Sequence, residues 1–201
     1  MQKSDTPYSM SFSTGTLFRQ PSILIAELYT ELGDWVAVRA NVLNNNLLQA
    51  RTQNTANRVC REIISRLKLM TSDQMSILTE GFPKDQGYIL WAAVCKRYRF
   101  IHDFAVEVVH EKFLNMDLQL THDDYDLFFN LKAEWHSEIG HVKESTRNKL
   151  RQVIFKMMRE CELLSEGQMI IPILLNPSME KCIQDDPDLT LAIFPVEDRK
   201  A

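Results

Sequence analysis

Two segments of the chain combine helical periodicity with an excess of basic side chains, a combination that suits the binding of a nucleic acid. Residues 51–70 carry five basic side chains and one acidic one, and residues 143–160 carry six and two. Each segment opens with hydroxyl and amide side chains followed by arginine, as in a helix whose N-terminal residues reach base edges or phosphates in a DNA groove. The candidate contact residues are Arg51, Thr52, Asn54, Thr55, Arg58 and Arg61 in the first segment, and Ser145, Thr146, Arg147, Lys149 and Arg151 in the second.

In this interpretation the Arg and Lys side chains neutralise phosphate, while the Ser, Thr and Asn side chains orient the N-terminal ends of the helices. Each segment also follows an earlier helical pattern across a short connection, 35–48 before the first and 122–138 before the second. This is the order of a helix-turn-helix. More often, however, a charged stripe is only the solvated face of an amphipathic helix. The pattern alone leaves both interpretations open.

The other reactive side chains form no pattern that is typical of catalysis or metal binding. His102 and His110 lie eight residues apart, which is not the spacing of a tight ligand pair, and surface histidines are the commoner explanation. The acids that follow His122 lie at a predicted helix start, where they favour the helix dipole. No phosphate-binding glycine loop and no nucleophile elbow is present. We therefore expect no enzymatic activity, no catalytic residues, no metal and no cofactor.

The composition is that of an ordinary globular protein. The chain has 201 residues, 45% of them hydrophobic and 25% charged, and its formal net charge is −4, so binding to nucleic acid would depend on local charge. The most apolar stretch, residues 88–95, is far shorter than the roughly 20 residues of a membrane helix. The four cysteines form no CxxC pair and fit reduced, buried thiols. These features predict a cytoplasmic protein without a membrane span.

Apolar spacing and capping residues predict helices over most of the chain. Gly33 ends the first helix and Asp34 caps the second, while Thr71 and Thr121 begin two further helices. The helix from Thr121 is expected to turn Tyr125, Phe128, Phe129 and Leu131 inward. The expected helices are 21–33, 35–48, 52–69, 71–81, 84–114 as one long helix or two broken near Phe100, 122–138, 145–161 and 178–183.

Two apolar runs late in the chain predict strands, residues 169–175 and 189–194, with Pro172 implying an edge position for the first. Together they would form a wing behind the second basic helix. The expected fold class is mainly α, a compact helical protein with two helix-turn-helix or winged-helix-like units and a small C-terminal β-hairpin wing. The expected parts are an extended lead-in (1–16), an N-terminal helix-turn-helix-like unit (17–82), central core helices (83–120) and a C-terminal winged-helix-like unit (121–201).

Several stretches of the chain resemble the BrxA family of BREX bacteriophage-defence systems, and the resemblance runs from about Ser9 to Val196. These stretches are FSTGTLF at 12–18, NLLQARTQNTANR at 46–58, EIISRL at 62–67, STRNKL at 145–150 and IIPILL at 170–175. The resemblance implies a small non-enzymatic component of a system that methylates host DNA and blocks phage replication. It also implies a helical fold with helix-turn-helix or winged-helix units and double-stranded DNA as a ligand.

Two alternatives to DNA binding remain open. BrxA proteins have been likened to NusB-type antitermination factors, which implies RNA as the ligand of a helical bundle. The chain could also be an interaction scaffold for other BREX proteins, with its basic faces meeting acidic partners. Competition between duplex DNA and RNA separates the first alternative from DNA binding, and co-purification without nucleic-acid binding would favour the second.

Overall fold

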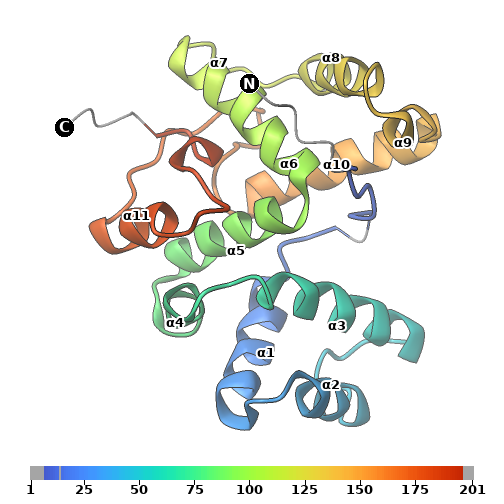
Figure 1. Cartoon of the computed structure of the whole chain (residues 1–201), viewed down its shortest axis with the longest axis vertical. Helices are drawn as coiled ribbons and strands as arrows, with labels where there is room; N and C mark the ends of the chain where they lie inside the picture. Colours follow the sequence, from blue (N-terminus) through green and yellow to red (C-terminus); the bar gives the residue numbers. More distant parts are fainter. Residues whose placement is uncertain (1–6, 14, 197–201) are drawn as a thin grey trace.

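The computed structural model describes residues 7–13 and 15–196, and its regular structure is helical (Figure 1). Within these residues no helix is long and apolar enough to cross a bilayer. The elements in chain order are α1 (Arg19–Leu32), α2 (Trp35–Asn44), α3 (Gln53–Leu67), α4 (Ser72–Glu80), α5 (Pro83–Arg97), α6 (Arg99–Phe104), the π-helix η1 (Ala105–His110), α7 (Glu111–Leu114), α8 (His122–Ala133), α9 (Ser137–Gly140), α10 (Glu144–Glu160), α11 (Pro177–Gln184) and the 3₁₀-helix η2 (Leu191–Ile193).

The helix ends lie where local capping chemistry predicts them. Gly33 ends α1 in the left-handed conformation, at φ 66°, and the Asp34 carboxylate accepts hydrogen bonds from the first amides of α2. Thr71 forms a reciprocal capping box with Gln74 at the start of α4, and Thr121 forms one with Asp124 at the start of α8. Each cap satisfies backbone groups that a helix end leaves unpaired. These predicted boundaries are therefore confirmed.

Helix α5 forms the centre of the core. Its residues 87–95 are all buried, and Figure 1 shows α1–α4 below this helix and α6–α10 above it. The predicted break of the long central helix occurs at Tyr98, whose backbone is extended. The Tyr98 hydroxyl donates to the Glu62 carboxylate of α3, at 2.7 Å from Oε1. Since Tyr98 is buried and tied to α3, the next helix must leave in a new direction.

The predicted β-hairpin wing is wrong. In the described part of the chain, residues 169–175 make only isolated bridges, Gln119 to Met169 and Leu164 to Ile170, and residues 189–194 contain η2 instead of a strand. Core side chains hold this last segment: Trp91 Nε1 donates to the Ile193 carbonyl and His110 Nδ1 to the Phe194 carbonyl, each at 2.9 Å. The first run also bonds to neighbouring loops, since the Ile170, Ile171 and Ile173 amides donate to the Leu118, Leu163 and Pro195 carbonyls, so the two runs lie against the body of the protein and do not project as a wing.

Three further side-chain predictions can be compared with the structure. His110 was expected on the surface but is buried, at 5% exposure. Its ring donates a hydrogen bond to the Phe194 carbonyl in the core. Leu131 was expected to point inward but is 52% exposed, whereas Tyr125, Phe128 and Phe129 are buried as predicted. The prediction that the cysteines are buried is confirmed, since all four are buried and unpaired.

Candidate nucleic-acid interface

Helix α3, which carries the first basic segment, belongs to a group of three helices that pack against one another, α1, α2 and α3 (Figure 1). Ala56, Cys60 and Ile63 form its buried side. Eight residues, 45–52, connect α2 to α3, which is longer than the three or four of a compact helix-turn-helix. The Asn46 side chain closes this loop by accepting from the Ala50 amide and donating to its carbonyl. The loop therefore has its own hydrogen bonds as it delivers Arg51 to the start of α3.

The predicted hydroxyl residues at this helix start act as caps. The Thr52 Oγ1 accepts from the Thr55 amide at 3.2 Å and donates to the Thr55 hydroxyl at 2.9 Å. Thr52, Asn54 and Thr55 are all exposed. A helix start has free amides in its first turn and carries the positive end of the helix dipole, so this end is suited to meet a phosphate.

The predicted arginines of α3 face solvent with their charge unmatched. The side chains of Arg51, just before α3, and of Arg58 and Arg61 are exposed, and none of these side chains has a hydrogen bond or ion pair with another described residue. The acid of this segment, Glu62, lies toward the core, where Arg66 Nε donates to it at 2.8 Å. Arg66 is 1% exposed and is therefore a structural residue of the core. The outward face of α3 thus carries cations and no acid.

One cation beside this face was not among the predicted site residues. Arg39 of α2 is exposed and donates through Nη2 to the Asn57 side chain of α3 at 3.0 Å. Its guanidinium also acts on the buried Cys60: burial raises the pKa of that thiol, and the Arg39 charge opposes the rise. Arg39 lies outside the basic run, so only the packing of α2 against α3 brings it to the interface.

Helix α10, which carries the second basic segment, uses two of its predicted contact residues inside the protein. Arg147 Nε donates to Asp126 Oδ1 of α8 at 2.9 Å and its Nη1 to Asn130 at 2.9 Å. Arg151 Nη1 donates to the other carboxylate oxygen of Asp126. The Arg147 guanidinium also lies over the Phe129 ring, 4.7 Å from its centroid. One carboxylate therefore clamps both arginines against α8.

The other predicted residues of α10 remain available at its N-terminal end. Ser145 and Lys149 are exposed and Thr146 is half-buried. None of the three has an ion pair or hydrogen-bonded side chain in the described ranges, and the N-cap residue Lys143 supplies no side-chain cap. Among the described residues this end of α10 thus offers two hydroxyl groups and the amines of Lys143 and Lys149, a weaker set of phosphate ligands than the exposed arginines at α3.

A short segment, residues 15–17, lies between α3 and α10 and is hydrogen-bonded to both helices. The Leu17 amide donates to Glu160 Oε2 of α10 at 2.7 Å, and Arg66 Nη1 of α3 donates to the Thr16 carbonyl at 2.8 Å. Gly15 lies so close to Val153 that a Cβ there would overlap that side chain. In Figure 1 both helices start at the right of the view and run in the same sense. Their N-terminal ends therefore point toward the same side of the molecule.

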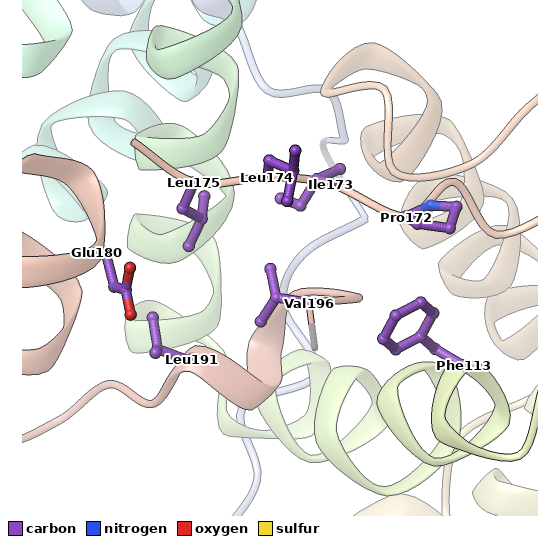
Figure 2. Close-up of a pocket in the computed structure, with 8 residues that line it drawn as sticks. All are labelled: Phe113, Pro172, Ile173, Leu174, Leu175, Glu180, Leu191 and Val196. Carbon is purple, nitrogen blue, oxygen red and sulfur yellow. The ribbon is translucent and has the colours of Figure 1, made fainter. Parts of the chain in front are cut away.

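The described residues contain little else that could carry chemistry. No three His, Cys, Asp or Glu side chains come together there in a metal-binding arrangement. An apolar cavity of about 370 Å³ lies between residues 172–175, α11 and η2, and Glu180 is the charged side chain among those that line it (Figure 2). Burial raises the pKa of the Cys95 and Cys161 thiols, which keeps them protonated and unreactive.

Comparisons with known proteins agree with the resemblance in the sequence. The BREX protein BrxA of Escherichia coli O9:H4 (strain HS) is 24% identical over 160 residues, 80% of this chain and 75% of that protein. The BREX protein BrxA of Bacillus cereus (strain H3081.97) is 23% identical over 146 residues, 73% of this chain and 71% of that protein. A crystal structure of an uncharacterized protein from Magnetospirillum magneticum has the same fold, with a TM-score of 0.78 at 19% identity over 90% of this chain and 93% of that chain. A sequence profile described as BrxA matches residues 6–186. The chain therefore belongs to the BrxA family.

Proposed function

We propose that this chain is a non-enzymatic, double-stranded DNA-binding component of a BREX phage-defence system, and that α3 is its principal contact surface. The E. coli and B. cereus relatives are each named as a BREX protein, which supports the placement in that system. Other BREX proteins are then its natural protein partners.

The observation that carries the DNA-binding proposal is the unmatched charge on α3. Arg51, Arg58 and Arg61 are exposed and have no ion-pair partner among the described residues. An α-helix fits the major groove of B-DNA, which is about 12 Å wide, and arginines along such a helix can reach phosphates on its edges. A protein of net charge −4 binds a polyanion only where cations are locally in excess, as they are on this face.

Helix α10 makes the smaller contribution in this proposal. The Asp126 carboxylate already accepts hydrogen bonds from Arg147 and Arg151, so each arginine would have to leave that carboxylate before it could bind a phosphate. Ser145, Thr146 and Lys149 remain free for contact at the helix start. Because α3 and α10 begin toward the same side of the molecule, both ends could meet one duplex (Figure 1).

The test is a fluorescence anisotropy titration with duplex DNA and sequence-matched RNA at about 50 and about 200 mM salt. Each lost phosphate contact should reduce the log–log salt slope by about 0.9, so Arg58→Ala/Arg61→Ala should reduce it by about 2. Arg147→Ala/Arg151→Ala should change the slope little. The control variant Lys84→Ala/Lys181→Ala removes the same charge from exposed positions of α5 and α11, and it should bind like the wild type.

Three results would count against the proposal. Equal binding by wild type and Arg58→Ala/Arg61→Ala would exclude α3 as the contact surface. A clear preference for RNA would favour the antitermination alternative. The absence of nucleic-acid binding near physiological salt, together with co-purification of other BREX proteins, would favour the scaffold alternative. Circular dichroism of each variant establishes that it remains folded.

A further inference from the structure

A stripe of large apolar side chains on α8 faces solvent. Leu127, Leu131 and Trp135 follow one another at intervals of four residues, and they are 63%, 52% and 72% exposed. Residues spaced by four lie on one face of a helix and its continuing turn. The opposite face of α8 already packs against the core, because Tyr125 and Phe129 are buried there. A helix that is apolar on two faces normally has a partner on each of them.

The stripe borders a groove of about 310 Å³ between α8 and the η1–α7 segment. Leu127, Leu131 and Phe128 line its α8 side, and Val108 lines the other side. Two further exposed apolar side chains lie at the end of α7: Leu114, which is 47% exposed, and Met116, which is 78% exposed. Five of the large exposed apolar residues therefore lie on and around these two neighbouring elements.

The rim of this groove is acidic. Four carboxylates line it, namely Glu107, Glu111, Asp117 and Asp124, against a single lysine, Lys112. Lys112 pairs with Asp117 at 2.6 Å and with Asp124 at 3.3 Å, and Lys132 pairs with Glu107 at 2.6 Å. Even with both lysines counted, four carboxylates exceed two amines, and Glu111 has no ion-pair partner among the described residues. The groove would repel DNA and attract a cationic partner.

We propose that this groove binds a basic amphipathic helix of another protein. The partner would place apolar side chains at positions i, i+4 and i+8 against the α8 stripe, with lysines or arginines opposite the acidic rim. The stripe covers eight residues of rise, about 12 Å, which corresponds to about two turns of a partner helix. The ion pairs of Lys112 with Asp124 and of Lys132 with Glu107 join the two sides of the groove, so the groove is formed before the partner arrives.

The exposed basic face at α3 in a second copy of the chain does not supply such a helix. This face exposes polar and charged side chains from Arg51 to Arg61 and has no apolar ridge there. The groove also lies toward the opposite end of the long molecular axis from α1–α3 (Figure 1). The interaction is therefore independent of the DNA-binding proposal, and both ligands could be bound together.

The experiment uses a synthetic helical peptide of about 18 residues, made only of Leu and Lys in an amphipathic order. Two matched peptides replace every Lys with Glu, or every Leu with Ser. We expect the Leu/Lys peptide to bind the full chain and both matched peptides to bind at least about tenfold more weakly. Hydrogen exchange should show protection of α7 and α8 by the peptide. Sedimentation of the free chain should show a monomer.

Protein variants locate the binding site. Leu127→Ser/Leu131→Ser should weaken peptide binding at least about tenfold, and Glu111→Lys by about threefold. The matched control Leu174→Ser alters an 83% exposed leucine that lies outside this groove and should bind normally. Arg58→Ala/Arg61→Ala should also bind the peptide normally, even if it no longer binds DNA.

The proposal is overturned by any of three results. The first is unchanged peptide affinity in both Leu127→Ser/Leu131→Ser and Glu111→Lys. The second is equal binding of the Lys and Glu peptides. The third is a dimer of the free chain that Leu131→Ser dissociates, because the groove would then be occupied by a second copy. If Leu127→Ser/Leu131→Ser melts early, Glu111→Lys decides alone, since it replaces a charged residue on the rim.

Discussion

Asp126 is the most informative single residue to change, because one carboxylate holds two basic side chains of α10. It accepts from Arg147 and Arg151, and the Asp126 carbonyl accepts a further bond from Arg147 Nη2 at 3.0 Å. The substitution Asp126→Asn keeps the size of the side chain and removes its charge. Two partly buried guanidinium groups then lose their counter-ion.

The expected magnitude follows from how far these groups are buried. The side chains of Asp126, Arg147 and Arg151 are 28%, 22% and 17% exposed. Such pairs lie between exposed ion pairs, which contribute about 0–1 kcal/mol, and buried pairs, whose disruption costs about 3–5 kcal/mol. We expect Asp126→Asn to lower the free energy of unfolding by about 2 kcal/mol. In a chain of this length the Tm falls by about 4–8 °C.

Calorimetry and DNA titration together test this reasoning. Asp188→Asn is the matched control. The Asp188 side chain is 76% exposed and its carboxylate lies as far as 4.0 Å from Lys96 Nζ, so the Tm of this variant should equal that of the wild type. If the freed arginines turn to phosphate, the DNA salt slope of Asp126→Asn should steepen by up to about 2. An Asp126→Asn variant with the Tm of the wild type would refute the clamp. An unchanged salt slope would mean that the arginines of α10 stay against α8 even without it.

Two further predictions concern stability. Gly33→Ala should lower the free energy of unfolding by about 1 kcal/mol, because Gly33 adopts φ 66°. A Cβ at this position meets no neighbour, so the cost comes from the backbone conformation alone. Gly33→Asn should therefore lower the free energy of unfolding by less in the same thermal melt. Burial by itself would raise the pKa of Asp186, but the hydrogen bonds from Lys96 and Gln74 outweigh it and hold that pKa below its ordinary value. The stability that Asp186 contributes is therefore present above about pH 5 and lost as the pH falls through the lowered folded-state pKa, so denaturant titrations should show the cost of Asp186→Asn shrinking below about pH 4. A cost that is constant from neutral to acidic pH would contradict this assignment.

The features that the sequence predicts correctly are those decided within one turn of helix. Gly33, Asp34 and Thr121 end or begin helices through contacts with residues two to four positions away. Such signals can be read without the rest of the fold. The same holds for the basic segments, since residue types and helical spacing alone place Arg58 and Arg61 on one face.

The features that the sequence predicts wrongly depend on distant partners. Residues 189–194 form an apolar run that resembles a strand. In the structure, however, Trp91 donates to the Ile193 carbonyl and His110 donates to the Phe194 carbonyl, and these donors lie 102 and 84 residues earlier in the chain. Leu131 fits the inward pattern of α8, yet the groove beside α7 leaves it in solvent. Neither outcome could be predicted from periodicity, because periodicity states that a residue is apolar and not which neighbour covers it.

The two basic helices make the same point about function. In sequence they are nearly equivalent, each with a polar start, several arginines and few acids. In the structure Arg58 and Arg61 of α3 face solvent, while Arg147 and Arg151 of α10 meet Asp126, which lies 21 residues before Arg147. A basic helix is thus a candidate interface only when the element packed against it supplies no acid. Asp126 pairs with the arginines of α10, and Glu62 of α3 turns to the buried Arg66, so Arg58 and Arg61 have no acidic partner among the described residues. A net charge of −4 is therefore compatible with a cationic face, because opposite charges are gathered on different elements.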